Sequence, residues 1–235
     1  MCGLRESGGR RPGTNDDLPN CRVLRAPRAF THTGVDYAGS ILVRYGSGRG
    51  HWAHKAYIGF FVCMTTKAIH LELVSDYSFT AFLAAYQRFI ARRGMPTTIY
   101  SDNGTTFQGA DREMRSAHAH AVKHPGFADR LATDGTTWRF IPPAAPHFEG
   151  LCDAVVRSVK SHLKRCVGSH SLSMEEMYTF LCRVEACLNS RPIAALSESI
   201  DNYQAMTPGH LLIGAPIVAM PEPSVLNLSE TRLFR

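Results

Sequence analysis

The pattern of apolar and polar positions in the first third of the chain predicts three consecutive β-strands. Over residues 68–74 apolar side chains alternate with His70 and Glu72, and this period of two is typical of a strand with one buried face. Residues 56–64 are nearly all apolar, which favours a strand buried on both faces. An apolar run over 34–43 predicts the first strand. Together the three segments predict an antiparallel meander.

Helical spacing follows the meander. Apolar residues recur at helical intervals over 79–90, with Ser78 or Thr80 as a candidate N-cap and Gly94 as a terminator. Downstream, the pattern predicts two short strands and three further helices, in chain order 97–100 (strand), 111–122 (helix), 136–141 (strand), 148–167 (helix) and 174–189 (helix). This order favours an α/β layer structure built on a mixed sheet.

Local signals mark the end of the patterned region. Ser173 and Glu176, three residues apart at the start of the last predicted helix, form a capping box. Beyond Pro192 the chain is predicted to be loop-like. We therefore expect a flexible leader over 1–30, a core over 31–215 and a tail over 216–235.

Composition narrows the class of protein. A chain of 235 residues with 44% hydrophobic residues is large enough for one domain with a buried core. A net charge of +6 is compatible with a polyanionic partner such as nucleic acid. Seven cysteines without C-x-x-C spacing favour reduced thiols in an intracellular protein, and no His/Cys spacing suggests zinc. No stretch approaches 18 consecutive apolar residues, so no membrane partner is expected.

Two aspartates stand at positions that suit a metal-binding role. Asp36 interrupts an apolar strand, where a carboxylate is costly unless its charge is compensated by a metal or by a nearby Lys or Arg. Asp102 follows a predicted strand at the point where functional groups gather on open sheets. The sequence Asp-Asn-Gly-Thr is also typical of an ordinary Asx turn, so both interpretations stay open for Asp102.

A third acid, Asp153, lies in the first turns of the helix predicted over 148–167. At helical spacing Asp153, Arg157, Lys160 and Lys164 fall on one stripe, while the valines of the same helix fall elsewhere. An acid followed by three bases suits a metal site beside a phosphate track. The alternatives are an acid stabilised by the helix dipole and a solvated face with an Asp–Arg pair. Three gathered carboxylates can hold two Mg²⁺ ions for attack on a phosphodiester.

Six ordered motifs resemble the integrase catalytic core of retroelements, with the greatest similarity to BEL/Pao-type retrotransposons. They cover roughly residues 20–215. The motifs are Thr33-Gly34-Val35-Asp36-Tyr37-Ala38-Gly39, Lys67-Ala68-Ile69-His70-Leu71-Glu72-Leu73, Ser101-Asp102-Asn103-Gly104-Thr105, Pro146-His147-Phe148, Leu188-Asn189-Ser190-Arg191-Pro192 and Thr207-Pro208-Gly209-His210.

The resemblance implies a ribonuclease-H-like fold, with a five-stranded mixed sheet flanked by helices. It implies two Mg²⁺ or Mn²⁺ ions held by an acidic triad, removal of nucleotides from DNA ends, and joining of the 3′-hydroxyls to target DNA. Double-stranded DNA would be the partner, an active form would be a homo-oligomer, and a functional protein would act in the nucleus. The residues carried over are Asp36, Asp102 and Asp153 as catalytic metal ligands, Lys160 and Lys164 at the DNA, and Asn103 and His147 shaping the site where the DNA binds. Arg157, on the same stripe as the two lysines, completes the predicted DNA-binding residues.

Some features depart from the family pattern. Asp153 stands where the family has Glu, and Glu149 stands where it has Gly. The leader carries no zinc-binding His/Cys module and little chain follows the core, so the sequence is expected to be a fragment of a larger polyprotein. The departures keep two alternatives open: a catalytically inactive DNA-binding remnant, and a non-functional fragment.

Overall fold

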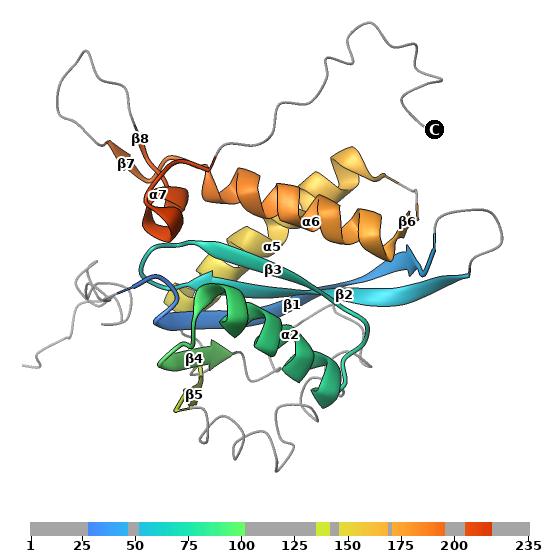
Figure 1. Ribbon diagram of the computed structural model, residues 1–235, viewed down its shortest axis with the longest axis horizontal. Helices are drawn as coiled ribbons and strands as arrows, with labels where there is room; N and C mark the ends of the chain where they lie inside the picture. Colours follow the sequence, from blue (N-terminus) through green and yellow to red (C-terminus); the bar gives the residue numbers. More distant parts are fainter. Residues whose placement is uncertain are drawn as a thin grey trace, which may run out of the picture.

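The computed structural model describes residues 28–46, 52–101, 135–141, 146–168, 171–195 and 205–217. They form a mixed sheet with strand order β3-β2-β1-β4-β5 and helices packed on it (Figure 1). Strands β1 (His32–Arg44), β2 (Ala53–Cys63) and β3 (Ile69–Val74) are paired antiparallel, which confirms the predicted meander.

The other half of the sheet is parallel. Strand β4 (Thr98–Ser101) pairs in parallel with β1, and β5 (Thr137–Phe140) pairs in parallel with β4. Parallel neighbours require a crossover connection, and α2 (Phe79–Arg93) provides it between β3 and β4. Ser78 rather than Thr80 is its N-cap, because the Ser78 Oγ accepts a hydrogen bond from the Ala81 N–H at 3.1 Å.

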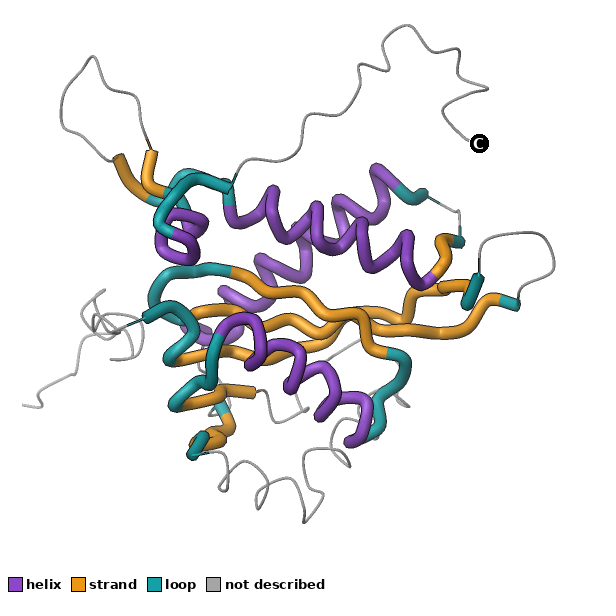
Figure 2. Tube along the Cα trace, in the orientation of Figure 1, coloured by secondary structure: helices purple, strands orange, loops and turns teal. Residues whose placement is uncertain are grey.

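Helices lie on both faces of the sheet (Figure 2). Helix α2 covers one face, and α5 (Pro146–Cys166) and α6 (Met174–Asn189) cover the other. The capping box of Ser173 and Glu176 is present, as predicted. A two-residue strand that the sequence did not predict, β6 (Leu172–Ser173), joins α5 to α6 and pairs with the end of β1.

The prediction of loop-like structure beyond Pro192 is wrong for the part of that segment that the structure describes. Strands β7 (Ala194–Ala195) and β8 (Ala205–Met206) pair, and α7 (Pro208–Ile213) follows. Elements of two to six residues are too short to produce a readable periodicity. The glycine of the Thr-Pro-Gly-His motif has a packing reason: a Cβ on Gly209 would lie 2.8 Å from Cγ1 and 3.1 Å from the backbone nitrogen of Ile217.

The prediction that β3 is half-buried is also wrong, because all six of its residues are buried. His70 and Glu72 have 0% exposure. His70 Nε2 lies 2.9 Å from Glu72 Oε1, Arg88 Nε donates to Glu72 Oε2 at 2.6 Å, and Arg92 also donates to Glu72. His70 and Glu72 alternate with apolar residues in the sequence, which predicts exposure to solvent. They are buried because arginines of α2 supply the partner charges that burial requires.

Burial by itself would raise the pKa of Glu72, but hydrogen bonds from His70 and Arg88 and the charge of Arg92 outweigh it. Together they hold the pKa of Glu72 below its ordinary value of 4.5.

Two of the sequence motifs contact each other across the edge of the sheet. Asn189 in α6 accepts from the Ile69 N–H and donates to the Ile69 carbonyl, both at 2.8 Å. Glu185 accepts from the Leu71 N–H at 2.8 Å. Side chains of α6 therefore satisfy the outward-facing backbone groups of the edge strand β3, which would otherwise be open to pairing.

The described elements do not test two of the predictions made from the sequence. The helix predicted over 111–122 lies outside the described residues, and the division into leader, core and tail stays a prediction.

Phe30 is fully buried, with its ring edge-on to Phe89 at 5.3 Å between centroids. In the described ranges no helix is long and apolar enough to cross a bilayer.

Candidate functional site

The boundary between β1 and β4 brings the first acid next to the end of the fourth strand. Asp36 is half-buried in β1 and pairs with Phe60 of β2. Ser101, the residue before Asp102, pairs with Val35, the residue before Asp36. Ser101 is fully buried, and its Oγ accepts a hydrogen bond from Trp138 Nε1 at 3.0 Å, which fixes the end of β4. Asp102 and Asn103 themselves lie outside the described residues.

The side chain of Asp36 belongs to the face of the sheet that α5 covers. Alternate residues of a strand share a face, so Gly34, Asp36 and Ala38 point to one side. Ala38 packs in the core beneath α5 and α6, whereas Val35 and Tyr37 pack in the core beneath α2. This assignment places Asp36 on the α5 side.

A close contact positions α5 over β1. A Cβ on Gly34 would lie 3.3 Å from the Cys152 Sγ and 2.4 Å from the Met64 Cε, so the absent side chain makes room for the helix. Cys152 is buried, and the next residue, Asp153, is exposed. Asp36 and Asp153 therefore lie on the same side of the sheet. The sequence analysis did not recognise the role of Gly34 and Cys152, and the only signal was a glycine two residues before the aspartate.

Asp36 interacts with its immediate surroundings. Its Oδ1 accepts a hydrogen bond from the Tyr37 N–H at 2.7 Å. Burial, and after it the negative charge of Asp36, raises the pKa of Tyr77 well above its ordinary value of 10.0. The shift shows that the Asp36 carboxylate and the Tyr77 side chain are close enough to interact.

The predicted stripe on α5 is exposed to solvent over its whole length. Asp153, Arg157, Lys160 and Lys164 are all exposed, whereas Val159 on the opposite side of the helix is fully buried. Arg157 Nε donates to the main-chain carbonyl of Asp153 at 3.3 Å. The helix thus offers three cations in line with one carboxylate, and their role in binding DNA stays a prediction.

The structure describes the other predicted site residues only in part. The backbone of His147 lies in the first turn of α5, and its side chain lies outside the described residues. In the described ranges no group of three or more His, Cys, Asp or Glu side chains could hold a metal ion. Asp102 lies outside those ranges.

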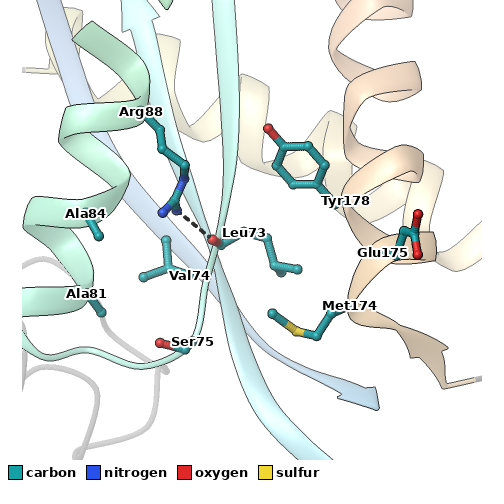
Figure 3. Close-up of a pocket in the computed structure, with 9 residues that line it drawn as sticks. All are labelled: Leu73, Val74, Ser75, Ala81, Ala84, Arg88, Met174, Glu175 and Tyr178. Atoms are coloured by element: carbon teal, nitrogen blue, oxygen red, sulfur yellow. Dashed lines mark hydrogen bonds between the residues drawn. The ribbon is translucent and has the colours of Figure 1, made fainter. Parts of the chain in front are cut away.

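A groove of about 520 Å³ lies elsewhere, between α2, the end of β3 and the start of α6 (Figure 3). Its charged lining residues are Arg88 and Glu175. Arg88 already donates to Glu72 and, at 3.1 Å, to the Leu73 carbonyl. The groove sits at the β3 edge, two strands away from β1, and holds none of the predicted acids.

Comparisons with known proteins give the fold. Neither a family model nor a curated protein matches this chain. The catalytic core domain of BIV integrase matches with a TM-score of 0.50 and 14% identity, over 79% of this chain and 95% of that chain. A chain in the simian T-cell lymphotropic virus intasome, in complex with PP2A regulatory subunit B56 gamma, matches with a TM-score of 0.51 and 15% identity, over 91% of this chain and 65% of that one. The chain therefore has the ribonuclease-H-like fold of a retroviral integrase core, as the resemblance predicted.

Proposed function

We propose that this chain is the catalytic core of a BEL/Pao-type retrotransposon integrase, a metal-dependent polynucleotidyl transferase that processes DNA ends and joins them to target DNA. The observation that carries the proposal is the β1–β4 register, in which Ser101 pairs with Val35 one residue before each of the first two acids. The second support is the Gly34–Cys152 contact, which sets the Asp153 helix over the same side of the sheet.

Asp36, Asp102 and Asp153 would hold two Mg²⁺ or Mn²⁺ ions. Carboxylate oxygens are the hard donors that these ions prefer, and a cation would compensate the half-buried charge of Asp36. Bound ions would activate the attacking hydroxyl or water and stabilise the leaving oxygen. The chain's own contribution is orientation: the Tyr37 N–H holds the Asp36 carboxylate, and packing at Gly34 holds α5 in place.

The DNA would lie along α5. Exposed Arg157, Lys160 and Lys164 would neutralise phosphates of double-stranded DNA, while Asn103 and His147 would shape the site near the acids. An active form would be a homo-oligomer acting in the nucleus.

Asp153 is the residue on which activity depends most. Asp is one methylene shorter than Glu, about 1.5 Å of reach, and a misplacement of about 1 Å costs on the order of 10²-fold in rate. The test is strand joining by purified protein with Mn²⁺, comparing wild type, Asp36→Asn and Asp153→Glu. We expect Asp36→Asn to abolish joining and Asp153→Glu to raise it.

The exposed acid Glu175, at the start of α6 beside the groove at the β3 edge, gives the matched control, Glu175→Gln, which should join DNA as wild type does. Joined product from Asp36→Asn, or none from both wild type and Asp153→Glu, would rule out the enzyme.

A second candidate function, an inactive DNA-binding remnant, is favoured by the shorter third acid beside an intact cationic helix face. It predicts salt-dependent DNA binding without joining under any metal. Binding that persists after alanine replaces Arg157, Lys160 and Lys164 together would exclude it.

A further inference from the structure

The side of the sheet that carries Asp36 continues from β1 onto β4 and β5. Gly34 of β1 pairs with Tyr100 of β4, and Tyr100 pairs with Arg139 of β5. Side chains of directly paired residues point to the same side of a sheet, so Arg139 shares the side of Gly34 and Asp36. The packing agrees, because Trp138, the residue before Arg139, packs against the core on the opposite side, beneath α2.

Arg139 is an exposed cation on this side of the sheet. None of the ion pairs in the part of the chain that the structure describes includes it. Strands β4 and β5 contain no Asp or Glu, and the acid that follows β4 in the sequence is Asp102, one of the predicted metal ligands. The five N–H donors of the Arg139 guanidinium are therefore available to a phosphate, which a guanidinium can bind through two parallel hydrogen bonds.

The charge of Arg139 acts along this side of the sheet as far as β1. Burial, and after it the positive charge of Arg139, lowers the pKa of His32, which stands two residues before Gly34 on the same side of β1.

Strand register gives the separation of Arg139 from the first acid. Arg139 is offset from Asp36 by two residues along the strand and by two strands across the sheet. At about 3.3 Å per residue and about 4.8 Å per strand, the two Cα atoms are roughly 12 Å apart. An extended arginine side chain spans about 7 Å, so its guanidinium can reach to within about one or two nucleotide steps of the acid.

Cations therefore stand on both sides of the predicted acids. Helix α5, with its exposed Arg157, Lys160 and Lys164, packs on β1 and β2, whereas β5 is the edge strand on the other side of β1 (Figure 1). A DNA strand held on one side only can pivot about that contact, and a contact on each side of the reacting bond fixes the bond in place. This matters because a misplacement of about 1 Å costs on the order of 10²-fold in rate.

We propose that Arg139 binds a phosphate of the DNA strand that passes over Asp36, about one or two nucleotides from the reacting bond, and thereby positions that bond at the acids. This inference rests on the proposed function for the identity of the ligand as DNA. The contact is to the phosphate backbone, so it fixes the register of the strand and carries no preference for base sequence.

The experiment removes the charge of single phosphates and of Arg139 in combination. Duplexes carry one neutral methylphosphonate at successive positions on either side of the reacting bond, and binding to the full chain is measured by fluorescence anisotropy. Wild type should bind one of these DNAs, modified within about two nucleotides of the bond, about tenfold more weakly than unmodified DNA. Arg139→Gln should bind unmodified DNA about tenfold more weakly and lose nothing further at that position, because the interaction is already absent. Arg139→Lys, which keeps the charge, should recover most of the affinity.

Lys55→Gln is the matched control, because Lys55 is an exposed strand cation that pairs with Leu42 toward the far end of β1. It should bind unmodified DNA as wild type does and keep the full loss at the sensitive methylphosphonate. Equal losses of wild type and Arg139→Gln at every methylphosphonate overturn the inference. It is also overturned if Arg139→Gln binds every DNA as wild type does and changes only the Mn²⁺ concentration needed for joining, since Arg139 would then neutralise the acids and not a phosphate.

The two proposals fail separately. If Asp36-dependent joining occurs but Arg139→Gln responds to every methylphosphonate as wild type does, only the Arg139 contact fails. If no joining occurs with any metal but the loss at one methylphosphonate depends on Arg139, the Arg139 contact stands and the proposed function fails.

Discussion

Replacing Asn189 by alanine tests whether α6 stabilises the fold by satisfying the edge of β3. Asn189 is fully buried, and it both accepts from the Ile69 N–H and donates to the Ile69 carbonyl at 2.8 Å. Alanine removes both partners at once and leaves two buried backbone groups without hydrogen bonds. The residue stands in one sequence motif and its partner in another, so the perturbation also tests why the two motifs occur together.

The magnitude follows from the number of groups left unsatisfied. Each buried donor or acceptor without a partner costs about 1–3 kcal/mol, and water entering the space left by the amide would recover part of that cost. We therefore expect Asn189→Ala to lower the free energy of unfolding by about 3 kcal/mol. For a domain of this size that corresponds to a decrease in Tm of roughly 6–12 °C.

The assay is urea denaturation of wild type and variant followed by circular dichroism, with the slope of the transition used to confirm that the unfolded states are comparable. Ser190→Ala is the matched control, because the exposed Ser190 hydroxyl donates to the Ala186 carbonyl at 2.8 Å and to the Ile217 carbonyl at 3.1 Å, where water can replace it. It should change stability by less than about 0.5 kcal/mol. A loss below about 1 kcal/mol for Asn189→Ala would refute the reasoning, since it would mean that solvent satisfies the edge strand equally well.

Three further predictions concern the buried ion network, the last helix and the third acid. Glu72→Gln should cost about 2 kcal/mol at pH 7, less than a fully buried pair because Arg88 and Arg92 are 42% and 39% exposed and solvent screens them. The folded pKa of Glu72 lies below 4.5, so the stabilisation by its carboxylate is present above pH 4.5 and is lost as the pH falls through the folded pKa. The unfolding free energies of wild type and variant, measured by urea denaturation, should therefore converge in acid. A difference that stays constant with pH would contradict this. Gly209→Ala should destabilise by about 1–3 kcal/mol in the same melts, because the new Cβ meets the Ile217 backbone, and a neutral result would show that α7 moves freely. Asp153→Glu should raise the joining rate by up to about 10²-fold in a timed assay with Mn²⁺, and a decrease would argue against a metal-binding role for this position.

The sequence determined much of the local structure for physical reasons that act over short distances. The Ser173–Glu176 capping box and the helical spacing over 174–189 correspond to α6 as observed, because caps and periodicity depend on neighbours a few residues away. The apolar run of 56–64 predicted a buried strand, and β2 is that strand. The exposed stripe of Asp153, Arg157, Lys160 and Lys164 was predicted correctly because helix geometry alone places those side chains on one face.

What the sequence could not decide depends on contacts between distant segments. Alternation in 68–74 predicted a solvated face, yet Glu72 is buried because Arg88 and Arg92 arrive from α2 to neutralise it. Likewise Asp36 was a candidate from its apolar surroundings alone, but only the pairing of β4 with β1 and the packing of α5 on Gly34 show which residues share its side of the sheet. Residue types and spacing are enough to identify the acids and the helix that carries the third. The partners of a buried charge are set by the packing of α2, α5 and α6 on one sheet, which is information that the tertiary structure alone contains.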